Sequence, residues 1–137
     1  MVIIYNKLIP FGRYTSINIF TMLFTKKKKL NERILNHEKI HSVQMIEMAI
    51  VALLIMILVC FITKISYWWI LLSLCSFYIW YCIEYIFVRF FHKKQNNAYH
   101  DISLEEEAYQ FENDMEYLKN RKLFKWVDYL SIKSYKK

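Results

Sequence analysis

The sequence has very few residues that break regular structure. Its 137 residues include one glycine, Gly12, and one proline, Pro10. Tight turns depend on residues that tolerate a positive or a fixed φ angle, so a fold built from many short strands and turns is not expected. The length is that of one domain, and we treat residues 1–137 as a single unit.

Cysteine is also scarce. The three cysteines, Cys60, Cys75 and Cys82, are odd in number, and the chain contains no CxxC pair. This excludes a disulfide framework and a zinc site built from cysteines. All three lie in apolar stretches, where cysteine packs as a small apolar side chain.

Charge is nearly absent from two long stretches. Residues 45–63 contain one charged residue, Glu47, and residues 65–88 contain one, Glu84. About 20 apolar residues in a helix cross the 30 Å hydrocarbon core of a bilayer. The remaining chain is too short to cover two such helices in water. We therefore predict an all-α membrane protein with a two-span transmembrane helical hairpin in the lipid bilayer and helices in the cytoplasm.

The basic residues lie almost entirely outside these stretches. The net charge is +7, yet of the 19 Lys and Arg only Lys64 falls between the two spans. Lysine and arginine are retained on the cytoplasmic side of membrane spans, so both termini are expected in the cytoplasm and the protein in the inner (cytoplasmic) membrane. No motif for nucleic-acid binding accompanies the charge, and nucleic acid is not an expected partner.

The other segments have weaker patterns. Residues 1–30 are rich in β-branched and aromatic residues, which predicts an extended segment with a short β-hairpin or an edge strand, residues 15–24 being the better strand. Asn31 is placed to cap a helix that continues into the first span, over residues 31–63, and the second span covers residues 66–91. An acidic helix is expected over residues 103–120, opened by a capping box of Ser103 and Glu106. Residues 121–137 form a basic amphipathic tail suited to a membrane surface.

The stretch HEKIH, residues 37–41, carries the chemistry. Two histidines four residues apart on a helix point the same way, so His37 and His41 can bind one zinc ion. Glu38 lies on the flank of that face, where it can take a proton from water activated by the metal. The pattern predicts a zinc site with Glu38 as the general base.

A third ligand is expected in LEEEAY, residues 104–109. The apolar stripe of the predicted helix places Glu105 and Glu107 on its two flanks and Glu106 roughly opposite. Either Glu105 or Glu107 can therefore reach a buried metal, and helical geometry alone leaves the choice open.

HEKIH at a membrane boundary and a later EEEAY together resemble the motifs of the gluzincin membrane endopeptidases related to the CAAX prenyl protease and its bacterial heat-shock counterpart. The pairing of HEKIHSVQ with EEEAY also resembles a group of small bacterial membrane proteins with HExIHxxQ and ExEAY. The resemblance implies that Glu105 is the third zinc ligand, with Glu107 as the alternative. It also implies hydrolysis of peptide bonds in membrane-associated protein or peptide substrates. The alternative function is a non-catalytic membrane protein with a structural or partner-binding zinc site.

Three further residues, Gln44, Tyr109 and Glu112, are expected to contact the metal ligands. The E-x-x-A-D pattern of the family has an aspartate that orients a ligand histidine, and this chain has Tyr109 in its place. Asp101, Glu107 or Glu112 can supply the missing carboxylate. Gln44 lies seven residues after His37, nearly on the same helix face. The resemblance further implies that residues 15–24 bind an extended substrate by strand addition.

Overall fold

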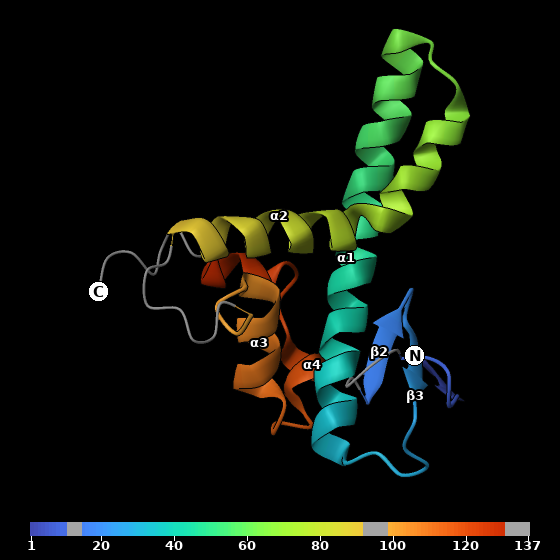
Figure 1. Cartoon of the computed structure of the whole chain (residues 1–137). Helices are drawn as coiled ribbons and strands as arrows, with labels where there is room; N and C mark the ends of the chain where they lie inside the picture. Colours follow the sequence, from blue (N-terminus) through green and yellow to red (C-terminus); the bar gives the residue numbers. More distant parts are fainter. Residues whose placement is uncertain (11–14, 92–98, 131–137) are drawn as a thin grey trace.

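The chain is organised around one long helix. A computed structural model describes residues 1–10, 15–91 and 99–130. Helix α1 (Glu32–Thr63) has a small sheet on one side of its first half and helix α3 (Ser103–Phe111) on the other (Figure 1). The protein is mostly helical, as expected, but the N-terminal segment forms a true sheet, so the class is not all-α.

The sheet has three strands, β1 (Val2–Tyr5), β2 (Ser16–Ile19) and β3 (Met22–Thr25), in the order β1-β3-β2. Strand β3 is central, parallel to β1 and antiparallel to β2. The stretch 15–24, expected as one strand, is therefore mostly a hairpin with a two-residue turn, and β2 is an edge strand beside α1.

The turn of this hairpin has an unusual sequence. Phe20 and Thr21 have φ angles of 49° and 64°, a region that asparagine and glycine normally occupy in such turns. A left-handed conformation costs a residue with a Cβ roughly 1–2 kcal/mol. The Phe20 amide donates a hydrogen bond to Tyr78 Oη at 2.9 Å, and the two rings pack edge to face. The tertiary contact with Tyr78 thus holds a turn that local sequence does not favour.

The two halves of helix α1 differ in the side chains that they bury and expose. Asn31 Oδ1 accepts from the Arg33 amide at 3.2 Å and so caps the helix where expected. The first half buries polar side chains, whereas the second half exposes large apolar ones such as Leu54 and Phe61, which are 63% and 74% exposed. Both α1 and the segment Tyr67–Phe90 are long and apolar enough to cross a membrane.

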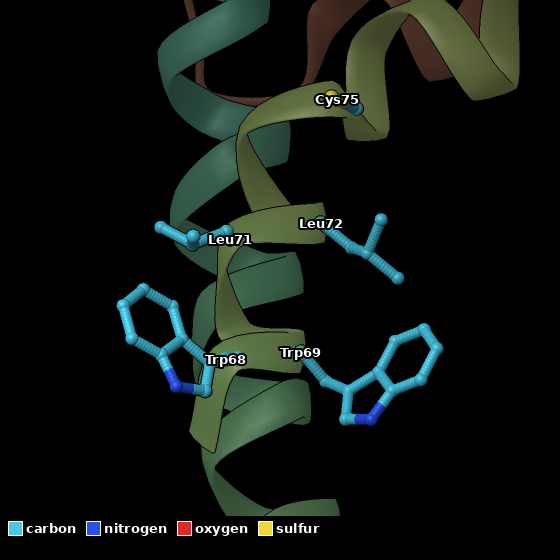
Figure 2. Close-up of a pocket in the computed structure, with 5 residues that line it drawn as sticks. All are labelled: Trp68, Trp69, Leu71, Leu72 and Cys75. Carbon is cyan, nitrogen blue, oxygen red and sulfur yellow. The ribbon is translucent and has the colours of Figure 1, made fainter. Parts of the chain in front are cut away.

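The second apolar stretch is not one straight helix. It consists of a 3₁₀ helix, η1 (Tyr67–Cys75), followed by α2 (Ser76–Phe91). In Figure 1, η1 runs back along α1 and α2 then turns across it. Figure 2 shows the outward side chains of η1, where Trp68, Trp69, Leu71, Leu72 and Cys75 line a shallow apolar depression. The predicted hairpin is thus formed by α1 and η1, and the segment bends at α2.

One face of α2 explains the bend. Phe77, Glu84 and Val88 are buried and lie at helical spacing, and Tyr81 falls between them on the same face. Glu84 accepts hydrogen bonds from the amide and the hydroxyl of Ser103, at 2.9 and 2.7 Å. These contacts bind α2 to the start of α3.

The acidic helix expected over residues 103–120 is broken. It ends at Phe111, and a second short helix, α4, spans Tyr117–Asn120. Asn36 of α1 donates hydrogen bonds to the carbonyls of Phe111, Glu112 and Asp114 at 2.9–3.2 Å. These bonds satisfy carbonyls that would otherwise continue the helix, so α1 fixes where α3 stops.

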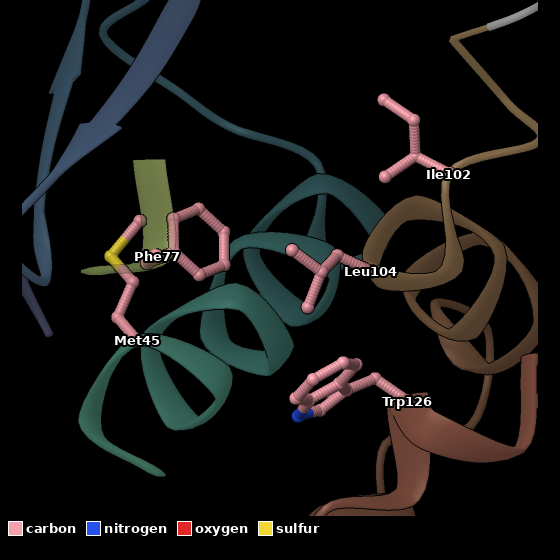
Figure 3. Packing of buried hydrophobic residues seen from close by; sticks show 5 residues of the cluster. All are labelled: Met45, Phe77, Ile102, Leu104 and Trp126. Carbon is pink, nitrogen blue, oxygen red and sulfur yellow. The ribbon is translucent and has the colours of Figure 1, made fainter. Parts of the chain in front are cut away.

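The C-terminal segment packs against the helices. The 3₁₀ helix η2 (Lys125–Tyr129) buries Trp126 in a core with Met45, Phe77, Ile102 and Leu104, where α1, α2 and α3 meet (Figure 3). Residues 121–130 therefore belong to the folded unit, in contrast to the expected surface tail. Residues 131–137 of that tail and residues 11–14 of the N-terminal segment lie outside the described residues. The core lies directly beside the histidines of α1.

Candidate metal centre

His37 and His41 face each other one turn apart on α1. Both side chains are buried, their rings pack edge to face, and their Nε2 atoms are 3.1 Å apart. The arrangement follows directly from the i, i+4 spacing on a continuous helix.

Glu105 is brought to the two histidines by α3. Its Oε2 lies 3.4 Å from His37 Nε2, and its Oε1 lies 3.4 Å from His41 Nε2. A tetrahedral ion with bonds of about 2.0–2.1 Å separates its ligand atoms by about 3.3–3.4 Å. His37, His41 and Glu105 thus form a buried group that can hold a metal ion.

Glu107, the alternative ligand, lies elsewhere. Its carboxylate bonds to Arg121, to Tyr117 Oη at 2.8 Å and to Gln44 Nε2 at 3.1 Å. The helix therefore presents Glu105 toward the histidines and Glu107 toward the C-terminal segment. The choice that helical geometry left open is resolved by which face of α3 packs on α1.

One hydrogen-bond partner and one ion-pair contact lie against the Nδ1 atoms of the imidazoles. Gln44 Oε1 lies 2.8 Å from His41 Nδ1, and Glu112 Oε2 lies 3.3 Å from His37 Nδ1. The Glu112 contact is an ion-pair distance, and the geometry is not that of an aligned hydrogen bond. Because Gln44 Oε1 is an acceptor, His41 Nδ1 carries a proton, and a metal ion would bind His41 through Nε2. This proton is assigned from the hydrogen-bond pattern.

The resulting electrostatics favour a cation. Two Nε2 atoms and a carboxylate converge, and Glu105 Oε2 is buried and has no aligned hydrogen bond from the described residues. Burial raises the pKa of Glu105, but its interactions with His37 and His41 outweigh burial and hold that pKa below its ordinary value. A buried carboxylate facing two imidazole nitrogens fits a divalent ion, which would replace the protons between them, and a His₂Glu set is typical of catalytic zinc.

Glu38 lies beside this cluster, on the side of the sheet. It is in the polar first half of α1 and is partly exposed. Burial raises its pKa, and the attraction of His41 and His37 opposes the rise. The side chain of Asn18, on β2, hydrogen-bonds to Glu38 and donates to its backbone carbonyl at 2.9 Å. Glu38 therefore has the environment of a group that takes up and releases protons.

Tyr109 contacts His37 through its ring. Its ring packs edge to face on His37, with centroids 4.7 Å apart. Tyr109 stands where the family has its aspartate, and the carboxylate near His37 comes instead from Glu112, which also pairs with Arg33. Asp101, another expected source, lies outside the described contacts of the two histidines.

Sequence reasoning missed Tyr81 and Asn18. Tyr81 Oη donates to Glu105 Oε1 at 2.9 Å, so α2 contributes to the site. Its only sequence signal is its position three residues before Glu84, on the same face of α2. Asn18 gives no signal, because its contact with Glu38 depends on how the sheet packs on α1.

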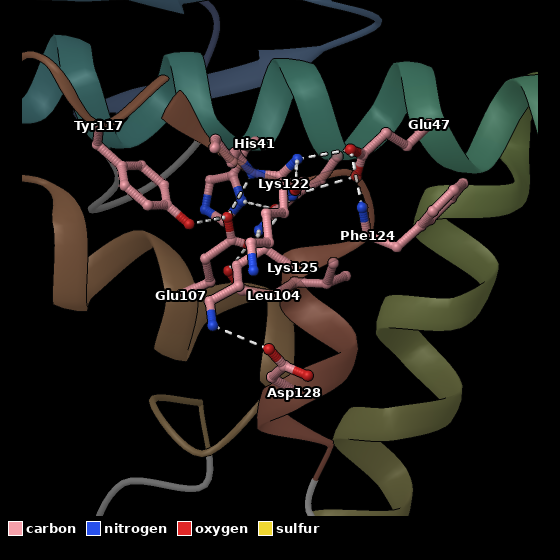
Figure 4. Close-up of polar contacts among 11 residues, drawn as sticks. His41, Glu47, Leu104, Glu107, Tyr117, Lys122, Phe124, Lys125 and Asp128 are labelled. Carbon is pink, nitrogen blue, oxygen red and sulfur yellow. Dashed lines mark hydrogen bonds and ion pairs between the residues drawn. The ribbon is translucent and has the colours of Figure 1, made fainter. Parts of the chain in front are cut away.

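The two carboxylates in the apolar stretches both have structural partners. Glu84 caps α3, whereas the expected capping box is absent: Ile102 is the N-cap residue and makes no side-chain cap bond. Glu47 pairs with Arg121 and accepts from the Phe124 amide at 3.0 Å (Figure 4). A buried carboxylate needs such partners.

Comparisons of the chain with protein-family models, with curated proteins and with solved structures give no match. The interpretation of the site therefore depends on its own geometry and chemistry.

Proposed function

We propose that this chain is a zinc-dependent membrane endopeptidase that hydrolyses peptide bonds of membrane-associated substrates at the cytoplasmic face. The observation that carries the proposal is the convergence of His37 Nε2, His41 Nε2 and the unsatisfied Glu105 Oε2, with Glu38 beside them. This combination of three ligands and an adjacent carboxylate of raised pKa is that of an HExxH hydrolase.

Glu38 is the proton carrier in this mechanism. When bound, zinc supplies Lewis-acid activation of water and of the peptide carbonyl. Glu38 takes the proton of the attacking water and delivers it to the leaving amide nitrogen, and its raised pKa makes it a stronger base for the first transfer. The Tyr81 hydroxyl donates to Glu105 Oε1 and can exchange this partner for a substrate oxygen.

The free edge of β2 supports an extended peptide as substrate. Tyr78 Oη donates to the Asn18 carbonyl at 3.4 Å, so this carbonyl points away from β3. In an antiparallel pair the amide of the same residue points the same way, so the Asn18 amide can donate to an added strand, whereas its carbonyl already accepts from Tyr78. Because the Asn18 side chain bonds to Glu38, a peptide on this edge passes beside the proposed base.

The charge distribution supports a membrane location. We place the α1–η1 hairpin in the inner membrane with both termini in the cytoplasm, because Lys64 alone of the 19 basic residues lies at its far end. The lysine run 26–29 directly precedes α1, where it can contact anionic headgroups.

A second candidate is a zinc site that stabilises the fold without catalysis. The burial of His37, His41 and Glu105 between α1, α2 and α3 favours it, because structural metal sites are closed. The two candidates differ at Glu38, which only a catalyst requires.

The test combines metal content with hydrolysis by the protein purified in detergent. Wild type, Glu38→Gln, His41→Ala and Glu105→Ala are compared, with Glu106→Gln as a control because Glu106 is exposed on the same helix. Zinc content is measured directly, and hydrolysis is followed with a fluorescent peptide library and an unfolded membrane-protein substrate.

We expect zinc in wild type, Glu38→Gln and Glu106→Gln, its loss in the other two variants, and hydrolysis only by wild type and Glu106→Gln. Zinc in wild type with no difference in hydrolysis between wild type and Glu38→Gln would favour the structural site. Wild type that takes up no zinc after reconstitution would refute both.

A further inference from the structure

Helix α2 buries one face and exposes the other. The exposed face is a stripe of four large apolar side chains at helical spacing, 48% to 79% exposed: Ile79, Ile83, Ile86 and Phe90. Glu84, one of the two charged residues of α2, lies on the opposite, buried face. A continuous stripe of large apolar side chains marks a surface that contacts a membrane or another protein.

The direction of α2 relative to α1 bears on what this stripe contacts. In Figure 1, α2 turns across α1, whereas η1 runs back along it. With α1 across a bilayer, a helix that crosses it in this way lies in the plane of the membrane. The segment Tyr67–Phe90 is long and apolar enough to span a membrane, yet the bend at α2 prevents it from doing so as one straight helix. The exposed stripe of α2 is therefore parallel to the lipid surface.

Contacts at the start of α2 place it where the apolar half of α1 begins. Tyr78 Oη lies 3.8 Å from the Sδ of Met45, the first residue of the apolar stretch 45–63. The same hydroxyl accepts from the Phe20 amide, so the turn between β2 and β3 lies at this level, and Phe20 is 46% exposed. The boundary between apolar and polar chain is the depth at which amphipathic helices bind a membrane surface.

A basic loop lies at the same level. The Phe124 amide donates to Glu47 Oε1 at 3.0 Å, and Glu47 follows Met45 by two residues. Next to Phe124, Leu123 is 77% exposed, and Lys122 beside it is exposed as well. An exposed lysine beside exposed apolar side chains suits the headgroup region of anionic lipid. The surroundings of α2 thus favour lipid over a protein partner as the cover of its exposed stripe.

We propose that α2 is an interfacial helix, which lies in the plane of the cytoplasmic leaflet with its exposed stripe in the lipid, and is not part of a second membrane span. Its opposite face carries Tyr81 and Glu84, which bond to Glu105 and to Ser103 of α3. The helix therefore lies between the lipid and the candidate metal centre. The inference rests on the membrane location proposed above, and it does not depend on whether the site binds zinc.

The test measures the depth of single spin labels along α2. The full chain, with its three cysteines changed to alanine, is reconstituted in vesicles of phosphatidylethanolamine and phosphatidylglycerol. One new cysteine at a time carries the label, at each of the four positions of the exposed stripe. Depth is measured from the accessibility of the label to oxygen, which concentrates in lipid, and to a water-soluble nickel chelate.

Helix α1 offers a matched control series. Its exposed apolar residues include four with the same spacing as the stripe of α2: Ile50, Leu54, Ile57 and Phe61. A helix upright in the membrane changes depth by about 1.5 Å per residue, or about 16 Å from position 50 to position 61. We expect this gradient along α1, and a single shallow depth with high oxygen access at all four positions of α2. If a label at Ile79 disturbs the fold, positions 83 and 90 are compared with positions 54 and 61, for which the same reasoning gives a difference of about 10 Å along α1 and none along α2.

A depth gradient along α2 equal to that along α1 would overturn the inference, because α2 would then cross the bilayer. Labels on α2 that neither reagent reaches would overturn it too, because protein would cover the stripe, and so would labels that the nickel chelate reaches freely. A missing gradient along α1 would refute the membrane location of the hairpin together with this inference. The zinc measurements described above are separate, so failure of the metal site leaves the depth measurement decisive.

Discussion

The substitution Glu84→Gln tests whether the Glu84 carboxylate anchors the start of α3, and with it the metal ligand Glu105. Its buried carboxylate accepts from the Ser103 amide, from the Ser103 hydroxyl and from Trp80 Nε1, at 2.9, 2.7 and 3.2 Å. The change to glutamine keeps the shape of the side chain but replaces one acceptor oxygen with an NH₂ donor. Two of the three donors share one oxygen, so at least one buried bond to a charged group is lost.

A hydrogen bond to a charged group contributes about 1.5–3 kcal/mol, and we take this as the loss in the free energy of unfolding for Glu84→Gln. For a chain of this size the loss corresponds to a decrease in Tm of roughly 5–12 °C. Glu105 lies two residues after Ser103, so a looser start of α3 also displaces a metal ligand, and we expect zinc affinity to fall by about tenfold.

The assay is thermal unfolding in detergent together with zinc titration, for wild type, Glu84→Gln and Ser103→Ala. The Ser103 variant removes one hydrogen bond to Glu84 and keeps the amide bond, so its effect on Tm should be the smaller of the two. If Glu84→Gln matches wild type in both Tm and zinc affinity, the carboxylate is not what anchors α3.

Two other outcomes follow from the same geometry. Asn36→Ala removes a donor from three carbonyls at the end of α3, of which those of Phe111 and Asp114 keep the backbone amides of Asp114 and Tyr117. The unpaired Glu112 carbonyl should lower stability by about 1–3 kcal/mol, whereas Asn113→Ala, at an exposed position, should not; thermal unfolding of the two variants compares them. Zinc at 100 times its Kd should stabilise wild type by about 2.7 kcal/mol, and a chelator should remove this gain. A zinc-dependent Tm that persists in Glu105→Ala would show that zinc acts at another site.

Local patterns in the sequence were sufficient to predict much of α1. The cap at Asn31, the absence of breakers and the i, i+4 histidines all act within one helix, where spacing along the chain determines spacing in space. Gln44 and Glu112 were also expected near the ligands, since each shares a helix face with one of them. These residues lie where helical periodicity alone places them.

What the sequence did not predict depends on contacts between distant segments. The hairpin turn at Phe20 and Thr21 is held by Tyr78, and the end of α3 is set by Asn36, 75 residues before Phe111. The choice between Glu105 and Glu107 required knowing which face of α3 meets α1. The bend before α2 likewise follows from the Glu84–Ser103 contact, which no pattern within the apolar stretch encodes.

The continuity of α1 has one more consequence for the proposed enzyme. His41 precedes the apolar stretch that begins at Met45 by four residues, or about 6 Å along a helix, and neither glycine nor proline interrupts the interval. With the apolar half of α1 in a bilayer, the continuous helix holds the metal ligands at a fixed height above the lipid surface. Such an enzyme would select its substrates by how near a flexible segment lies to the membrane, before any side chain of that segment is recognised.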